Sequence, residues 1–391
     1  MTEMMDQIFV DLKHWLVSFA PAQWQPLISA FVSVAALIGV FAILFALTTI
    51  LERKGLGRIQ NRYGPNRVGP FGLLQPAADG VKALIKEDLV PRSADPVVHF
   101  LAPLVLVVPA FLALAVLPMG RNMAAVDLDA AVLFFFAVGA ATELSVFMAG
   151  WSSRNKYSLL GAMRAIAQMI SYEIPLILSG VCAIMMAGSL STESIVNAQA
   201  GYSGWVPHWF VLTPWGLAGF VLFMIAAAAE SNRAPFDLPE GESEIIAGYY
   251  IEYSGFKFAL FFLGEYIGMF AVSGLGITLF LGGWRAPAPF LEWIPSYVWF
   301  FGKLLAIIAV FIWVRGTLPR LRIDQLMGFA WKFMLPMALV DILAAGIWHF
   351  TPPGITRWVV GTLLVSGPYV FLVRGLASHG RVMKRKYRYA E

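Results

Sequence analysis

Long apolar runs, separated by short polar segments, occupy most of this chain. A stretch of about 20 mostly apolar residues is long enough to cross a lipid bilayer as a helix. Nine stretches meet this condition, at residues 27–50, 98–118, 130–150, 158–189, 213–230, 256–282, 297–314, 327–349 and 355–374. The fourth and sixth are long enough to tilt or to extend beyond the bilayer. The pattern predicts an all-α polytopic membrane protein with about nine transmembrane helices, built as a single transmembrane domain over residues 1–391.

The composition agrees with this interpretation. Hydrophobic residues make up 59% of the chain and charged residues only 13%, about half the charged fraction of a typical soluble domain. The N-terminal segment, MTEMMDQIFVDLKHW, is acidic and lacks the basic start and small-residue cleavage site of a signal peptide. We expect it to lie at the membrane interface.

Lysine and arginine are distributed unequally between the two sides of the predicted bundle. One side consists of four loops and a basic tail at residues 375–391, and together with Arg374 it carries 23 of the 28 basic residues. The other side carries four, Lys13, Arg121, Arg285 and Arg357, and Lys303 lies within a span. Because basic loops stay in the cytoplasm, the N-terminus is expected outside and the C-terminus inside. The Ala- and Gly-rich spans favour a bacterial cytoplasmic (inner) membrane. An organellar inner membrane would orient the chain in the same way, so that alternative stays open.

The first inner segment, residues 51–97, combines a basic loop with an amphipathic helix. Residues 52–70 read ERKGLGRIQNRYGPNRVGP, whose four glycines and two prolines prevent one helix from running through. From charge alone, such a loop could simply contact anionic lipid headgroups. From Phe71 to Lys86, however, apolar and polar residues separate onto two helical faces. This separation predicts a short interfacial helix after the first span, placed to roof an opening between spans.

An acidic loop, residues 231–255, follows the fifth span on the same side. Between Glu230 and Glu252 the chain has six carboxylates and one basic residue, Arg233. Glu240, Glu242 and Glu244 alternate, so an extended backbone would point all three in one direction. Such a cluster can titrate as a coupled group and pass protons near neutral pH. The alternative is a solvated acidic face that docks a basic partner.

Three further carboxylates fall within predicted spans: Glu143, Glu173 and Glu265. A charge at the bilayer centre costs about 2.5–3.5 kcal/mol on insertion scales. These acids therefore either line a hydrated proton path or stay protonated as structural hydrogen-bonding groups. Lys303 and Asp341 lie in later spans towards the outer side, where pairing, snorkelling and a role in the path are equally open.

The chain offers few residues for a redox or metal centre of its own. Its one cysteine, Cys182, cannot build an iron–sulfur cluster, a structural zinc site or a disulfide framework, and its five histidines are scattered near different helix ends. It also has no phosphate-binding motif and no nucleophile beside a base. We therefore expect no catalytic or metal site, no covalently bound cofactor and no nucleic-acid partner. Any electrons must come from other proteins.

Three motifs carry a resemblance to a known family: ERKGLGRIQNRYGPNRVGPFGLLQPAADGVKALIKED from Glu52, ESNRAPFDLPEGESE from Glu230 and RGTLPRLRIDQLM from Arg315. Together they resemble the quinone-site membrane subunit, the H subunit, of respiratory complex I, the proton-translocating NADH:quinone oxidoreductase. The resemblance implies a translocase subunit that takes part in electron transport, has no redox centre and is not catalytic alone. It also implies quinone as substrate, lipids around the chain, and partner subunits of three kinds. These are peripheral-arm subunits with iron–sulfur clusters and FMN, small membrane subunits, and antiporter-like subunits.

The resemblance also implies roles for particular residues. Those around the quinone chamber would be Glu52, Arg53, Arg62, Asp79, Phe236, Arg315 and Arg320. Those that couple quinone reduction to the proton path would be Glu143, Glu173, Glu230, Asp237, Glu240, Glu242, Glu244, Glu252 and Glu265. We expect the double variant Glu240→Gln, Glu242→Gln to assemble but to lose coupled quinone reduction.

Two other functions remain compatible with the residues alone. A similar subunit of a membrane-bound, energy-converting hydrogenase would use the same acids for proton coupling without a quinone. A stand-alone ion-coupled transporter could also place acids at the membrane midplane, although the sequence has no inverted repeat or matching pair of broken spans.

Overall fold

The computed structural model describes residues 2–238 and 247–379, and in this part of the chain helices dominate. Eight helical segments are long and apolar enough to cross a membrane, and a ninth apolar helix has 17 residues. Each corresponds to one predicted span, which confirms an all-α polytopic membrane protein. They are α2 (Gln25–Ile59), α4 (Pro96–Ala115), α5 with α6 (Ala131–Gly139, Ala141–Ser152), α7 (Lys156–Ala187), α9 (Pro214–Glu230), α11 (Gly255–Phe280), α12 (Ser296–Thr317), α13 with α14 (Ile323–Phe329, Leu335–Phe350) and α15 (Ile355–His379).

Shorter elements connect these spans. They are α1 (Thr2–Ser18), α3 (Gln75–Ile85), α8 (Thr192–Ala198), a small antiparallel hairpin of β1 (Tyr202–Ser203) and β2 (Val206–Pro207), and 3₁₀ turns at Pro70–Gly72, Phe210–Leu212, Gly248–Tyr250 and Pro289–Leu291. A π-helical turn, Ala330–Met334, joins α13 to α14. The helix α3 is the short amphipathic helix expected after the first span, and it begins one turn later than the predicted 71–86. Its place at the membrane interface stays a prediction.

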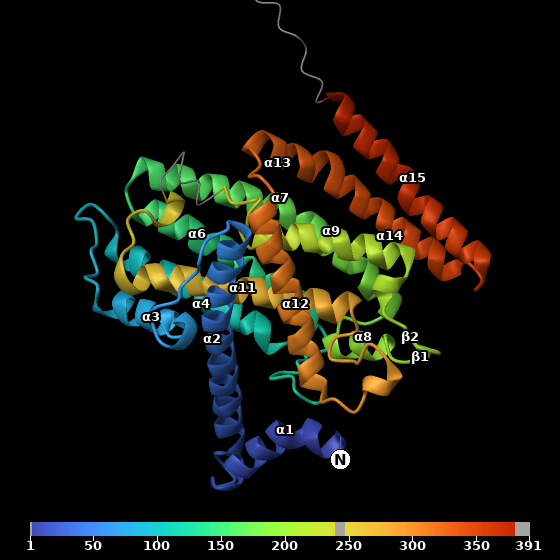
Figure 1. The fold of residues 1–391 in the computed structure, drawn as a ribbon, viewed down its shortest axis with the longest axis horizontal. Coiled ribbons are helices and arrows are strands. Elements are labelled where there is room, and N and C mark those ends of the chain that lie inside the picture. The colour runs from blue at the N-terminus through green and yellow to red at the C-terminus, as the bar shows by residue number, and fades with distance from the viewer. Residues whose placement is uncertain (1, 239–246, 380–391) are drawn as a thin grey trace, which may run out of the picture.

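The helix α11 forms the centre of the bundle (Figure 1). Between Tyr266 and Phe280 nearly every residue is buried, and α11 packs against α4, α9 and α12. Small residues permit this close packing, since a side chain at Gly276 would meet the ring of Phe223. On one flank α7 packs against α6, α9 and α14. The core therefore places the acidic residues of α6, α7, α9 and α11 near one another.

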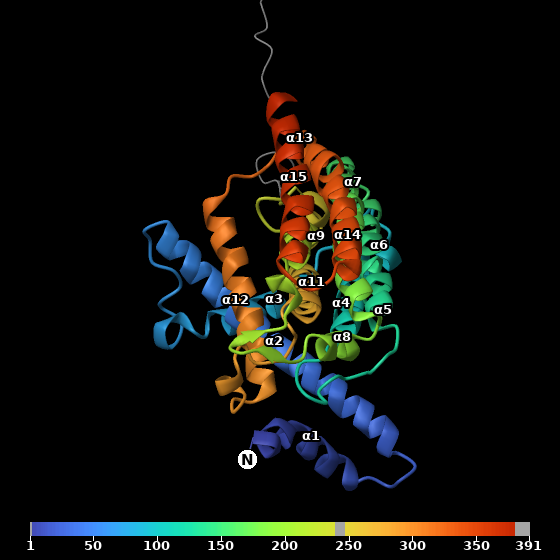
Figure 2. The same ribbon diagram turned by 90° about the vertical axis from the view of Figure 1, so that its right-hand side faces the viewer.

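The helix α2 stands apart from this core and crosses it at a steep angle (Figure 1). Many of its large apolar side chains are exposed, among them Phe31, Val34 and Ile43. At its N-terminal end α1 lies at a large angle to it, on the same end of the bundle as α8, the hairpin and the loop before α12 (Figure 2). At its other end α2 lies beside α3 and α12.

The first span is longer than the apolar pattern predicts, because α2 continues through Glu52 to Ile59. Its glycines do not stop the helix: Gly57 packs against the backbone of Arg62 and Gly64, where a side chain would not fit. The helix ends where Asn61 adopts a left-handed conformation (φ 53°) and Arg62 N–H donates to the Gly57 carbonyl at 2.8 Å. This is the ordinary geometry of a helix C-terminus. Glu52 and Arg53 are therefore fixed on a helix and do not lie in a loop.

Candidate functional site

A buried carboxylate, Glu52, accepts hydrogen bonds from three residues that are distant in the sequence. Its side chain lies on the last turns of α2 and is only 5% exposed. Arg233 donates to it at 3.3 Å, the Tyr266 hydroxyl at 2.5 Å, and Arg315 of α12 also donates to it. A buried charge is stable only when paired and hydrogen-bonded, and Glu52 meets both conditions. We call Glu52, Arg233, Tyr266 and Arg315 the Glu52 cluster.

A tight turn after α9 brings Arg233 into this cluster. Asn232 adopts a left-handed conformation (φ 50°), and Arg233 N–H donates to the Ala228 carbonyl at 3.0 Å. The guanidinium carbon then lies 3.9 Å from the centre of the Tyr266 ring. Burial disfavours its charged form, but Tyr266, Glu52 and Glu265 outweigh this effect and raise the pKa of Arg233 above its usual value. Arg233 therefore stays cationic.

A small cavity lies within the Glu52 cluster, bounded by Thr48, Met269 and the side chains of α12. Its volume of about 10 Å³ is close to the space that one water molecule requires. It is too small for a quinone ring, so a ring near this cluster must contact it from outside.

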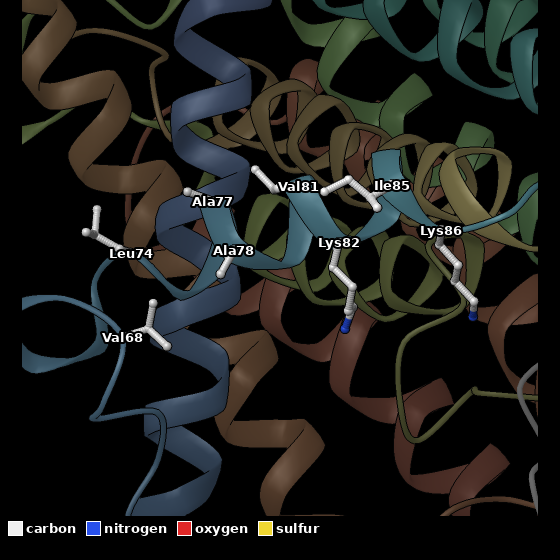
Figure 3. Close-up of a pocket in the computed structure, with 8 residues that line it drawn as sticks. All are labelled: Val68, Leu74, Ala77, Ala78, Val81, Lys82, Ile85 and Lys86. Carbon is white, nitrogen blue, oxygen red and sulfur yellow. The ribbon is translucent and has the colours of Figure 1, made fainter.

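A much larger hollow of about 810 Å³ follows the outer face of α3. Its lining residues are Val68, Leu74, Ala77, Ala78, Val81, Lys82, Ile85 and Lys86. Figure 3 shows the two lysines pointing away from Val81 and Ile85, so the groove has an apolar side and a basic edge. An apolar chain with a polar end would suit such a surface.

An ion pair attaches α3 to α2. Arg53 donates to Asp79 at 2.6 Å, and Gln75 also donates to Asp79 at 3.0 Å. Partial burial acts to raise the pKa of Asp79, but the bonds from Arg53 and Gln75 are stronger and lower it below its usual value. Two predicted chamber residues, Arg53 and Asp79, are thus direct partners.

The remaining predicted chamber residues lie in other places. Arg62 is exposed, and its Nε donates to the Gln60 side chain at 2.7 Å. Phe236 is buried with its ring centre 5.4 Å from that of Tyr172. Arg320 donates to the Leu238 carbonyl at 3.4 Å, two residues after Phe236. The structure therefore groups Glu52 with Arg315, Arg53 with Asp79, and Arg320 with the segment of Phe236, while Arg62 stands alone.

Three of the predicted coupling carboxylates meet between neighbouring helices. Glu143 of α6 and Glu173 of α7 lie close enough to act on each other, and both act electrostatically on Glu230 at the end of α9. Carboxyl groups whose charges interact in this way titrate as a coupled group. These three residues, which we call the carboxylate triad, can therefore store at least one proton.

Glu265 connects the triad to the Glu52 cluster. Its carboxylate accepts a hydrogen bond from Tyr249 at 2.8 Å and is close enough to act on Arg233. Glu265 and Glu230 line the same cavity of about 70 Å³, together with Ser231 and Asn232. Most of the cavity's lining is apolar, but the cavity is large enough for ordered water beside these polar groups. The described residues thus form a line of charged groups from Arg315 to Glu173.

The other predicted coupling residues are placed less fully. Glu252 accepts a hydrogen bond from Asn155 at 2.7 Å, near the start of α7. Asp237 lies half-buried in the segment after α9. Glu240, Glu242 and Glu244 fall outside the described residues, so their expected extended arrangement stays a prediction.

Two ionisable residues within later spans, Lys303 and Asp341, are held by structural contacts. Lys303 Nζ donates to the carbonyls of Leu281, Gly283 and Arg285 at 2.7–2.8 Å. Asp341 Oδ2 accepts from the Cys182 thiol at 3.4 Å. Among the interpretations left open for Lys303, these contacts favour pairing, here with backbone carbonyls.

Sequence reasoning missed Tyr266, Tyr249 and the role of Arg233. Arg233 was marked only as the single basic residue of an acidic segment, and that isolation was the available signal. Among residues 2–238 and 247–379, no three His, Cys, Asp or Glu side chains are grouped to hold a metal ion.

Comparison with known proteins identifies the family. The sequence matches the family model described as NADH dehydrogenase over residues 32–346. The H subunit of the NADH-quinone oxidoreductase of Dehalococcoides mccartyi (strain CBDB1) is 51% identical over 310 residues, which cover 79% of this chain and 84% of the relative. The chain belongs to the family of NADH-quinone oxidoreductase H subunits. The H subunit of Geobacillus kaustophilus is 46% identical over 339 residues, which cover 84% of this chain and 99% of the relative.

Membership in the H-subunit family confirms the resemblance carried by the three motifs, all of which lie within the matched residues. Members are parts of an oxidoreductase complex and do not catalyse the reaction alone. The Glu52 cluster, the carboxylate triad and Glu265 all belong to this matched part of the chain.

Proposed function

We propose that this chain is the membrane subunit of a proton-pumping NADH:quinone oxidoreductase, that it forms much of the quinone access chamber, and that it couples quinone reduction to a proton path. The observation that carries the proposal is the line of charged groups from the Glu52 cluster through Glu265 to the carboxylate triad. A purely structural set of acids would not need a cationic cluster at one end and a cavity of about 70 Å³ between Glu265 and Glu230.

The chamber lies at the inner ends of α2, α3 and α12, where partner subunits complete it. Their iron–sulfur clusters and FMN supply the electrons, and quinone is the substrate. The apolar groove along α3 suits a long isoprenoid tail in contact with the bilayer, and the Arg53 to Asp79 ion pair holds α3 in place beside it. The predicted residues Arg62, Phe236 and Arg320 belong to the chamber's border in this proposal.

Reduction of a quinone to a quinol takes up two electrons and two protons. The Glu52 cluster contains two guanidinium groups and one carboxylate, so its net charge of about +1 stabilises an anionic intermediate before the protons arrive. Interactions of this kind are strong where water is largely excluded. The chain's own contribution is therefore electrostatic: it holds positive charge near the site where negative charge develops.

Coupling follows from the position of Arg233. This side chain is shared between Glu52 and Glu265, so a new negative charge near the cluster weakens its hold on Glu265. Glu265 then takes up a proton more readily, and the change passes across the cavity to Glu230 and the triad. Moving one charge across the membrane costs about 2.3 kcal/mol per 100 mV, so several such equilibria must shift together. Asp237, Glu240, Glu242, Glu244 and Glu252 extend this path on the inner side.

We place the protein in a bacterial cytoplasmic membrane, with its N-terminus outside and its C-terminus inside. Small membrane subunits and antiporter-like subunits are the expected neighbours, because the exposed apolar faces of α2 and α15 can be covered by protein as well as by lipid.

The test is mild detergent purification through this chain, followed by reconstitution into proteoliposomes with NADH and a quinone. Inhibitor-sensitive NADH oxidation with proton uptake is the expected result. Recovery of a hydrogenase module, or of no redox partner, would overturn the assignment to a quinone chamber.

A further inference from the structure

A polar cavity of about 350 Å³ lies at the end of the bundle opposite the Glu52 cluster. It is built by α1, by the loop between α4 and α5, by β1, and by the segment that joins α11 to α12. Its residues that matter here are Asp6, Arg121, Tyr202, Trp284, Arg285, Glu292, Trp293 and Trp299. None of them takes part in the proposed quinone or proton chemistry.

Two arginines define the cavity. Arg121 and Arg285 both lie against the Trp284 ring, with their guanidinium carbons 5.5 Å and 5.0 Å from its centre. Arg285 is fixed by bonds to the Val196 carbonyl at 3.2 Å and the Asn197 side chain at 2.9 Å. Burial and the like charge of Arg121 lower the pKa of Arg285. The fold thus brings two cations together, an arrangement that an anion bound between them would stabilise.

Two aromatic side chains with polar groups, Trp299 and Tyr202, also line this cavity. The indole Nε1–H of Trp299 is buried and has no partner among the described residues. Tyr202 is held in place by its hydroxyl, which donates to the Ala286 carbonyl at 3.1 Å. Burial and the neighbouring Glu292 raise the pKa of Tyr202 to about 12, so this hydroxyl stays protonated. Buried donors without a partner are uncommon in folded proteins and call for a ligand or ordered water.

Acidic groups in the cavity argue against a simple phosphate site. Asp6 accepts a hydrogen bond from the Ser296 amide at 2.5 Å, and Glu292 lies at the exposed rim. A free inorganic anion would be repelled by both carboxylates. A ligand that carries an anionic phosphate and a cationic amine would satisfy the arginines and the acids together.

The surroundings of the cavity mark a membrane surface. Trp205, Phe290 and Trp293 are 75%, 58% and 66% exposed, and the rings of Trp205 and Phe290 lie 5.5 Å apart. Exposed tryptophans of this kind are typical of the membrane–water interface. The helix α1, which supplies Asp6, also exposes Phe9, Leu12 and Trp15. An amphipathic helix at the depth of these tryptophans lies in the plane of the membrane–water interface.

We propose that this cavity binds the headgroup of a phospholipid of the outer leaflet, with the phosphodiester held by Arg121 and Arg285 and a primary ammonium held by Glu292 and Asp6. Arginine suits the phosphate because its planar fork can donate two parallel hydrogen bonds. The bound lipid would fasten α1 to the start of α12. The proposal is independent of the quinone chamber.

The experiment uses the purified complex in proteoliposomes that contain a photoreactive phosphatidylethanolamine. Cross-links are mapped by mass spectrometry to the peptides around Trp293. Arg121→Gln is the main variant, because that side chain is exposed and its backbone contact to Ser296 is kept. Loss of one charge-assisted contact should reduce the cross-link yield about tenfold. Lys13→Gln, which removes an outer-side charge away from the cavity, should leave the yield unchanged.

Competition identifies the ligand. Unlabelled phosphatidylethanolamine should suppress the cross-link more than phosphatidylglycerol does, and Glu292→Gln should remove this preference. Equal yields in Arg121→Gln and wild type would overturn the proposal. So would competition by inorganic phosphate at the same concentration, which would indicate an aqueous anion site, or cross-links from this peptide to a partner subunit in place of lipid.

Discussion

Arg233 lies above the ring of Tyr266, and both side chains donate hydrogen bonds to the carboxylate of Glu52. The three residues come from the segment after α9, from α11 and from α2. Because each one holds the other two in place, the cationic end of the proposed coupling path is fixed by mutual contacts and not by one element. Removal of any member should therefore affect both stability and electron transfer.

Replacement of Glu52 by glutamine tests this dependence. The variant keeps the side-chain shape but removes the charge of the carboxylate to which the buried Arg233 donates a hydrogen bond, and leaves Glu265 as its more distant countercharge. Breaking a buried ion pair from one side costs about 3–5 kcal/mol. We expect Glu52→Gln to lower the thermal stability of the purified complex and to reduce quinone reductase activity at least tenfold.

Asp324→Asn is the matched control for Glu52→Gln. Asp324 pairs with Arg322 at 3.2 Å, but both side chains are largely exposed. Exposed pairs contribute about 0–1 kcal/mol, so this variant should resemble wild type. Normal stability and activity in Glu52→Gln would refute the structural role assigned to the cluster.

Glu230→Gln tests the carboxylate triad. The amide cannot accept or release a proton, yet it can still line the cavity shared with Glu265. We expect the complex to assemble while proton uptake per NADH oxidised falls severalfold in proteoliposomes. Asp129→Asn removes an exposed carboxylate from the loop before α5 and should leave the ratio unchanged. A wild-type ratio in Glu230→Gln would mean that the path does not pass through the triad.

Asp79→Asn tests the attachment of α3 to α2. A partly exposed ion pair contributes about 0.2–1 kcal/mol, so the amides of residues 75–85 should exchange about two- to fivefold faster with deuterium. Because the pKa of Asp79 is lowered on folding, its contribution is complete above the ordinary value of 3.8 and is lost only as the pH falls below it. The difference between variant and wild type should therefore be constant from pH 6 to 8. A difference that changes within this range would assign the attachment to another group.

The sequence predicted the spans well because an apolar run of membrane length is a local property. It could not predict the Glu52 cluster, because that depends on which face of each helix meets its neighbour. Glu265 and Tyr266 illustrate the difficulty. Adjacent residues on a helix point about 100° apart. Glu265 therefore lines the cavity that Glu230 also lines, whereas Tyr266 donates to Glu52. The pattern of charges marked Glu265 but gave no sign of the tyrosine beside it.

The C-terminal extension of α2 is a second feature that the sequence pattern could not predict. Gly55 and Gly57 reduce helix propensity by about 1 kcal/mol each relative to alanine, which favoured a loop after residue 50. In the structure both glycines are helical, because each one allows a close approach. A side chain at Gly55 would meet Ile312 of α12 at 3.1 Å, and a side chain at Gly57 would meet the backbone of Arg62 and Gly64. Tertiary packing outweighs local propensity here, and only the three-dimensional arrangement reveals it.

A variant of Lys303 tests whether this residue is structural or carries protons. Its ammonium donates to three carbonyls just beyond the end of α11 and lies 4.1 Å from the centre of the Trp209 ring. Methionine cannot donate to these carbonyls, and leaving buried polar groups unsatisfied costs about 1–3 kcal/mol each. We expect Lys303→Met to lower the melting temperature of the complex by several degrees, whereas Lys332→Met, at an exposed position, should not. If Lys303→Met instead kept its stability and lost proton uptake at normal NADH oxidation, the residue would belong to the proton path, and the path would have to extend from the triad to α12.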